Sequence, residues 1–212
     1  MSLKRISLLI SIFLIYTNTS NAQQYLSFAS GELMREKKYS GYEGNPYLFK
    51  DFTLSTVNNK YINVWMNVDL YDNTVLFSRN DSQFIFSEVI NEFNISTNGD
   101  TTSFKRANLI HPAMPIHFAE IISMTPVLLK VRKKDITELA TYGTEKKFRF
   151  VEQVDYYTIT NGAPNKIRLS KQEAQTVFGN KWKELENHAS GNKISFKTEE
   201  GWRNLIKYYQ SL

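Results

Sequence analysis

The sequence predicts an α+β protein in which an antiparallel, meander-like sheet, either a sandwich or a partly open barrel, precedes a C-terminal helical pair. Two observations lead to this fold class. Turn-forming residues recur about every ten residues between β-rich segments, as in antiparallel sheets. Segment 170–212 instead places apolar residues at helical spacing. We expect an antiparallel β domain at 45–169 and a helical pair at 170–212 packed on the same domain.

The composition limits the class of protein. The 212-residue chain can bury a sizeable core, and its 12 Tyr, 14 Phe and 3 Trp are too many for a disordered chain. The absence of cysteine excludes disulfides, cysteine-ligated zinc, iron–sulfur clusters and thiol catalysis. Without Lys4 and Arg5 the net charge falls from +5 to +3 and is spread along the chain, so nucleic acid is not an expected partner.

The first 22 residues have the three regions of a secretory signal peptide. Met1–Arg5 is short and basic, Ile6–Tyr16 is apolar apart from two serines, and Ser20 and Ala22 match a small-residue cleavage site. An uncleaved N-terminal anchor is the alternative, but the apolar run is too short to span about 30 Å of hydrocarbon. We expect an exported protein, periplasmic or extracellular, that spans no membrane after cleavage. Residues 23–44 would be a lead-in segment with one helical turn near 30–37.

The clearest strand is predicted at residues 61–70, where apolar residues occupy every second position between turn-forming pairs. Segments 52–57 and 74–78 would pair with this strand as hairpins. Its apolar face would carry Ile62, Val64, Met66, Val68 and Leu70, and its polar-aromatic face would carry Tyr61, Asn63, Trp65, Asn67 and Asp69.

The β pattern continues along the chain. Further strands are predicted at 84–90, 92–97, 102–107, 118–124, 127–131, 156–160 and 166–169, with hairpin turns at Asn98-Gly99 and Asn161-Gly162. A basic run, Lys130, Arg132, Lys133 and Lys134, suggests a charged sheet edge that discourages pairing with other chains. A site for an acidic partner is the alternative.

The C-terminal segment contains two helix starts. Ser170 and Glu173 form a capping box, and the helix should end near Ser190-Gly191. Thr198 should cap a second helix with two glutamates in its first turn. Tryptophans on both helices suggest that the helices pack on each other or on the sheet, with a partner-binding surface as the alternative.

No familiar catalytic or cofactor motif is present. The chain lacks G-x-S-x-G, S-x-x-K, P-loop and G-x-G-x-x-G patterns, and His111 and His117 do not have the spacing of metal ligands. We therefore assign no catalytic residue, no metal and no cofactor, and an enzyme is the less favoured class. A hydrolase remains an alternative; it would use His117 with Glu120, or one of the carboxylate pairs Glu88–Glu92 and Asp135–Glu138.

The polar-aromatic face of segment 61–70 is the candidate ligand site. Tyr61, Asn63, Trp65 and Asn67 combine aromatic rings with amides, as sugar- and peptide-binding grooves do. The alternative is that the rings pack under a helix or against neighbouring strands. If the sheet curls into a partly open barrel, the opposite face would line a cavity for an apolar ligand such as a lipid chain.

Three segments resemble small uncharacterised exported proteins of Gram-negative bacteria. Asn45–Phe52 is similar to their G-x-P-Y-L strand start, Leu70–Phe77 to their Y-D-N-x-L-F hairpin, and Leu205–Leu212 to their lysine-rich tail ending Y-Y-x-S-L. The resemblance extends over roughly residues 40–212. It implies export and the overall layout; that family has no assigned activity, so it implies no catalytic residues.

These observations lead to an exported, non-enzymatic binding or envelope-associated protein. Its partner would be a ligand or an envelope component that the sequence does not identify, and the sequence does not specify an oligomeric state. A periplasmic carrier of an apolar ligand and a hydrolase are the two alternatives.

Overall fold

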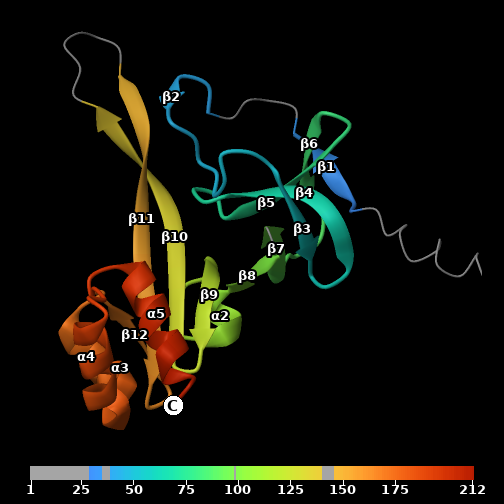
Figure 1. Ribbon diagram of the computed structural model, residues 1–212. Coiled ribbons are helices and arrows are strands. Elements are labelled where there is room, and N and C mark those ends of the chain that lie inside the picture. The colour runs from blue at the N-terminus through green and yellow to red at the C-terminus, as the bar shows by residue number, and fades with distance from the viewer. Residues whose placement is uncertain (1–28, 35–38, 98, 140–145) are drawn as a thin grey trace, which may run out of the picture.

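The computed structural model describes residues 29–34, 39–97, 99–139 and 146–212, so the expected signal peptide at 1–22 lies outside the described residues. The α+β fold is confirmed: one open sheet is followed by helices that pack on one end of it (Figure 1). Residues 31–33, where we predicted a helical turn, form a strand instead. No helix in the described ranges is both long and apolar enough to cross a membrane.

The sheet contains twelve strands within the described residues. β2 (Tyr42–Glu43) pairs in parallel with β11, and all other pairs are antiparallel. Most sequence neighbours lie side by side, so the predicted meander is confirmed. The hydrogen-bonded order is β1 (Gly31–Leu33), β6 (Ser82–Phe86), β5 (Thr74–Arg79), β4 (Tyr61–Asp69), β3 (Thr53–Val57), β7 (Glu92–Thr97), β8 (Asp100–Arg106), β9 (Phe118–Met124), β10 (Val127–Leu139), β11 (Lys147–Thr160) and β12 (Ala163–Ile167).

The two predicted helix starts, after Ser170 and after Thr198, are confirmed. α2 (Ala107–Ile110) is one turn between β8 and β9, and the C-terminal helices are α3 (Lys171–Phe178), α4 (Trp182–Gly191) and α5 (Glu199–Tyr209). The Ser170 and Thr198 hydroxyl oxygens accept the expected capping hydrogen bonds at 3.2 Å each. The first predicted helix is interrupted: Gly179 has φ +54°, and one 3-10 turn, η2 (Gly179–Lys181), joins α3 to α4.

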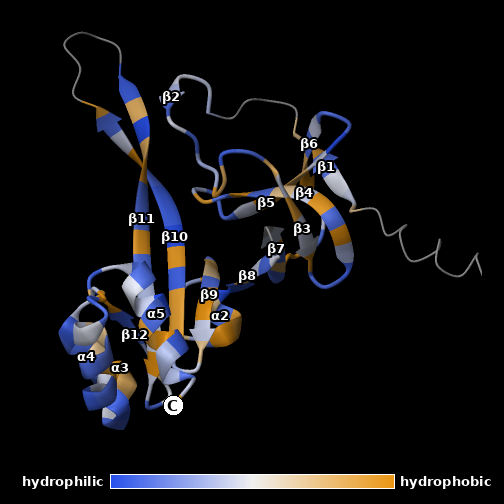
Figure 2. Ribbon diagram, in the orientation of Figure 1, coloured by the Kyte–Doolittle hydropathy of each residue, from blue (hydrophilic) through white to orange (hydrophobic). Residues whose placement is uncertain are grey.

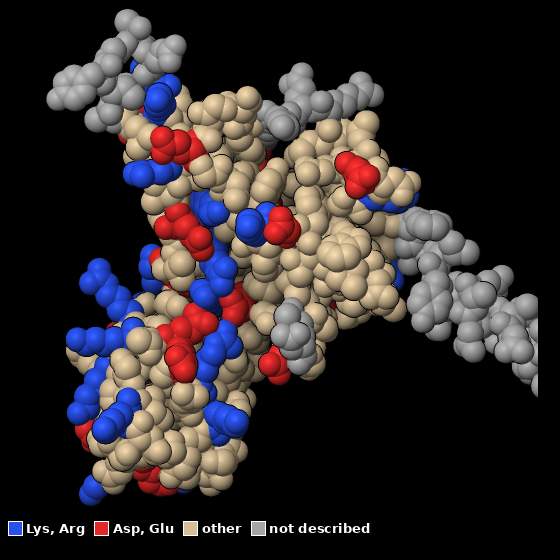
Figure 3. Space-filling view, turned by 45° about the horizontal axis from the view of Figure 1, so that its top comes forward, with Lys and Arg blue, Asp and Glu red and all other residues tan. Residues whose placement is uncertain are grey.

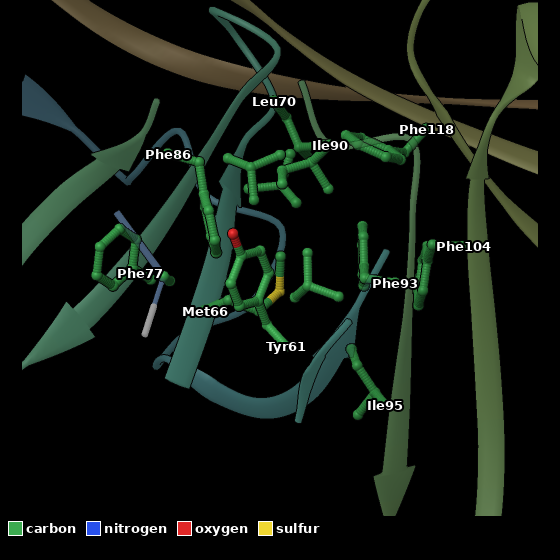
Figure 4. Close-up of a cluster of buried hydrophobic side chains, with 14 residues drawn as sticks. Tyr61, Met66, Leu70, Phe77, Phe86, Ile90, Phe93, Ile95, Phe104 and Phe118 are labelled. Carbon is green, nitrogen blue, oxygen red and sulfur yellow. The ribbon is translucent and has the colours of Figure 1, made fainter. Parts of the chain in front are cut away.

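Two larger hydrophobic cores lie at opposite ends of the sheet. The N-terminal core fills one face of β3–β8 and includes Met66, Phe93 and Phe104 (Figure 4). The C-terminal core packs the helices against β9–β12 around the fully buried Trp202. Figure 2 shows the same division, since hydrophobic colour follows β3, β4, β9 and the part of β10 near the helices. Helical packing on the sheet, predicted from the tryptophans, is confirmed.

A connecting segment, residues 42–48, joins the two ends of the sheet. Its β2 residues pair with the start of β11, and the Lys134 Nζ of β10 donates to the backbone oxygens of Asn45 and Tyr47 at 2.8 and 2.9 Å. The segment also bonds to the end of β4, because the Leu48 N–H donates to the Val68 carbonyl at 2.8 Å and the Leu70 N–H donates to the Pro46 carbonyl at 2.9 Å. This segment therefore connects strands that are not neighbours in the sheet.

The predicted alternation of β4 breaks at Asn63, which has φ +58°. Ser55 pairs with Val64 but Val57 pairs with Tyr61, so β4 has one extra residue opposite β3. Such a bulge moves the preceding residues to the other face of the sheet. Tyr61 is consequently buried in the core with 4% exposure. The prediction of one uninterrupted polar-aromatic face is therefore wrong.

The bulge leads to a stability prediction. Asn tolerates the left-handed backbone region, Gly has no steric cost there, and a β-branched residue is strained. We expect Asn63→Gly to keep the free energy of unfolding within about 0.5 kcal/mol of wild type and Asn63→Val to lower it by about 1–2 kcal/mol. Urea unfolding monitored by circular dichroism measures both.

Asn94→Val in β7 is the matched control, because Asn94 has ordinary strand geometry and Val favours strands. We expect no loss of stability there. Equal losses at positions 63 and 94 would show that the bulge does not require Asn63.

Candidate ligand-binding groove

The structure does not bring the four predicted ligand-binding residues together. Tyr61 lies in the N-terminal core, where Figure 4 shows its ring beside Met66 and Phe86. Asn67 is 1% exposed, because its side chain pairs with the backbone of Phe49: its Oδ1 accepts from the amide at 3.1 Å and its Nδ2 donates to the carbonyl at 3.0 Å. Both residues are structural in this fold.

Asn63 and Trp65 do reach the surface. Trp65 is 54% exposed and lies directly across from Leu54 of β3, which is 39% exposed. This pair lies on the face of the sheet opposite the N-terminal core. The packing alternative considered for the aromatic rings therefore holds for Tyr61 and not for Trp65.

A groove of about 330 Å³ lies on the core-bearing face, where the N-terminal core meets the central strands. Side chains on the same face of successive strands converge there, since Ile95 pairs with Thr102 and Phe104 pairs with Glu120 across the sheet. Aromatic and aliphatic residues form its walls, two hydroxyls line it, and a charged pair lies at one end. The lining residues are Phe49, Thr53, Ile95, Thr102, Phe104, Glu120 and Arg132.

Glu120 is a buried carboxylate contacted by three cations. It is 6% exposed, and its oxygens lie 3.3 Å from Arg132 Nη2 and 3.9 Å from Lys130 Nζ. Arg203 of α5 donates a short hydrogen bond to the other oxygen. Burying an ionised carboxylate is costly unless it is paired in this way. Glu120 therefore ties β9 to β10 and to the last helix.

Glu199, at the start of α5, extends this arrangement. Its carboxylate lies 2.7 Å from Lys130 Nζ and 2.8 Å from Arg203 Nη2, and accepts a hydrogen bond from the Tyr156 hydroxyl at 2.8 Å. Burial alone would raise the pKa of Glu199, but the three hydrogen bonds outweigh burial and lower its pKa to about 2. Burial and the bond to Glu199 raise the pKa of Tyr156.

Together these side chains form what we call the Glu120 cluster: Glu120, Lys130, Arg132, Tyr156, Glu199 and Arg203. The cluster joins β9, β10, β11 and α5 beside the groove. Figure 3 shows acidic and basic side chains alternating in a band along this part of the molecule. The cluster accounts for much of the basic run, which serves internal pairing; β10 lies between β9 and β11 and is not an outer edge of the sheet.

The residues considered for hydrolysis do not converge. Burial and the nearby cations Lys133 and Arg106 lower the pKa of His117, while Asp135 acts in the opposite direction. Glu120 belongs instead to the Glu120 cluster on the other face of the sheet. Among the described residues, no group of three or more His, Asp or Glu could hold a metal ion. The paired carboxylates each contact a separate lysine: Glu88 with Lys60, Glu92 with Lys105, Asp135 with Lys133, and Glu138 with Lys146.

Comparison with protein-family models, with curated proteins and with solved structures finds no match to this chain. The groove is therefore interpreted from its geometry. Sequence reasoning missed it because its lining comes from five strands and a loop that are far apart in the chain. The available indication was Glu120, the one acid in a mostly apolar strand that precedes the basic run.

The cluster leads to a prediction about stability. Glu120→Gln leaves three cations around a neutral amide, so we expect the free energy of unfolding to fall by about 3 kcal/mol. Glu138→Gln is the matched control, because its partner Lys146 is exposed and such a pair contributes about 0–1 kcal/mol. Urea unfolding compares the two variants, and similar losses would contradict a structural role for Glu120.

The lowered pKa of Glu199 leads to a prediction about pH. Its pKa is 4.5 ordinarily and about 2 in the folded chain. Its stabilising contribution is therefore complete above pH 4.5 and is lost as the pH falls through about 2. Glu199→Gln lacks this contribution. We expect the difference in unfolding free energy between wild type and Glu199→Gln to be constant near neutral pH and to shrink in acid; urea unfolding across this range measures it. A difference that does not change with pH would contradict the ion pairing.

Proposed function

We propose that this chain is an exported, non-enzymatic binding protein that holds a small ligand in the groove. The observation that carries the proposal is the composition of the groove, in which the apolar side chains of Phe49, Ile95 and Phe104 adjoin two hydroxyls and a charged pair. Ligand sites in proteins combine apolar walls with polar groups that fix the orientation of the ligand, and they have volumes of about 300–1,000 Å³. The Glu120 cluster supports the proposal because it holds β9 and β10 rigidly at one end of the groove.

Export is the part of the proposal that rests on sequence. The basic, apolar and small-residue order of residues 1–22 supports secretion. We also propose that the chain is related to the small exported proteins of Gram-negative bacteria that its three segments resemble. A binding role agrees with the separate lysine contacts of the carboxylate pairs Glu88–Glu92 and Asp135–Glu138.

The exposed Trp65–Leu54 pair is a second candidate binding surface. It is an exposed apolar pair on the opposite face of the sheet, outside the groove, which suits an envelope component better than an enclosed small molecule. The two candidates lie on opposite faces of the sheet and have only β3 in common, so substitutions can separate them.

Binding in the groove can be tested with the neutral fluorescent probe N-phenyl-1-naphthylamine. We expect saturable fluorescence enhancement with wild type and its loss in Thr102→Trp, because the indole ring would fill the groove. Thr101→Trp is the matched control: Thr101 is the preceding residue of β8, is exposed, and contacts Ser96 on the opposite face.

Two results would contradict the groove. Probe binding that survives Thr102→Trp unchanged would exclude it as the site. Probe binding that is lost in Trp65→Ala but retained in Thr102→Trp would assign binding to the Trp65–Leu54 pair instead.

A further inference from the structure

Arg132 has hydrogen-bonding capacity that the described chain does not use. A guanidinium carries five N–H donors, and the hydrogen bond of this side chain found in the described residues runs from Nη2 to Glu120 at 3.3 Å. Its Nε is buried and has no hydrogen-bond acceptor among the described residues. The carboxylate oxygen that forms an ion pair with this atom, Glu152 Oε1, is 3.9 Å away. The Arg132 side chain is 27% exposed and lines the groove.

Glu120 is not similarly available. Its two oxygens are contacted by Arg132, Arg203 and Lys130, so a cationic ligand would have to displace a resident cation. The two carboxylates of the Glu120 cluster face three cations, which leaves one positive charge in excess. Glu152 compensates that charge only weakly, because its side chain is 43% exposed and its Oε1 lies 3.9 Å from Arg132 Nε.

A further cation lies on the same face of β10. Lys134 is two residues beyond Arg132; burial lowers its pKa while Glu152 and Asp69 act in the opposite direction, and its Nζ donates to the backbone oxygens of Asn45 and Tyr47. The positive charge in excess within the Glu120 cluster therefore favours a negatively charged group at the charged end of the groove. The apolar part of the groove adjoins this charge, because Phe104 pairs with Glu120 across the sheet, and the rings of Phe49 and Phe104 lie edge to face at a centroid distance of 6.2 Å.

We propose that the groove takes a small organic anion, a carboxylate on a flat apolar body, with the carboxylate on Arg132 and the body against Phe49 and Phe104. This inference rests on the proposed binding function and adds the class of ligand. Arg suits the role because its planar guanidinium can donate two parallel hydrogen bonds to a carboxylate. The hydroxyls of Thr53 and Thr102 also line the groove.

The test uses 2-naphthoate and its neutral counterpart 2-naphthamide as competitors of N-phenyl-1-naphthylamine. On wild type we expect 2-naphthoate to displace the probe at about tenfold lower concentration, the effect of one charge-assisted contact. Arg132→Gln should remove this preference by weakening 2-naphthoate alone. Arg149→Gln is the matched control, since it removes the same charge from an exposed position on β11.

The outcomes separate the two proposals. If 2-naphthamide competes as well as 2-naphthoate on wild type, the anion assignment is overturned while binding in the groove stands, and this comparison needs no variant to fold. If the preference survives Arg132→Gln in a variant with wild-type circular dichroism, Arg132 is not the anion-binding residue. If Thr102→Trp leaves probe binding intact, the groove is not the binding site, and the ligand class proposed for the groove is contradicted as well.

Discussion

The structure depends on pairing one buried carboxylate, that of Glu120, with cations. Glu120 lies in the middle of the sheet, where an unpaired charge would destabilise the fold by several kcal/mol. The chain compensates it with cations from β10 and from α5, and the α5 cation, Arg203, is 83 residues from Glu120 in the sequence. Because these partners come from different elements, the charge is stabilised only when the sheet and the helices are assembled together.

The same requirement positions the groove. Residues on one face of neighbouring strands are held side by side by backbone pairing, so the walls and hydroxyls follow from the register of β3, β7 and β8. The charged end follows from the Glu120 cluster, which fixes Arg132 through Glu120. We therefore propose that the Arg132 guanidinium has two roles: one of its N–H groups pairs with Glu120, and others bind the ligand.

Much of the fold could be predicted from local patterns. The hairpins around β4, the caps at Ser170 and Thr198 and the packing of the tryptophan-bearing helices depend on residues close in sequence. The bulge at Asn63 could not, because an asparagine on a polar strand face and one in a left-handed bulge look the same in sequence. The groove could not be predicted either, because it depends on the pairing of β3 with β7, and these strands are far apart in the sequence.

The segment 42–48 has a consequence for how the molecule comes apart. Without it, the N-terminal half of the open sheet could peel away from the helical half along the line between β7 and β9. By bonding to β4 on one side and to β10 and β11 on the other, this short stretch acts as a clasp across that line. Separating the two halves would break these bonds as well as the pairing of β8 with β7 and β9, so we expect the halves to unfold together.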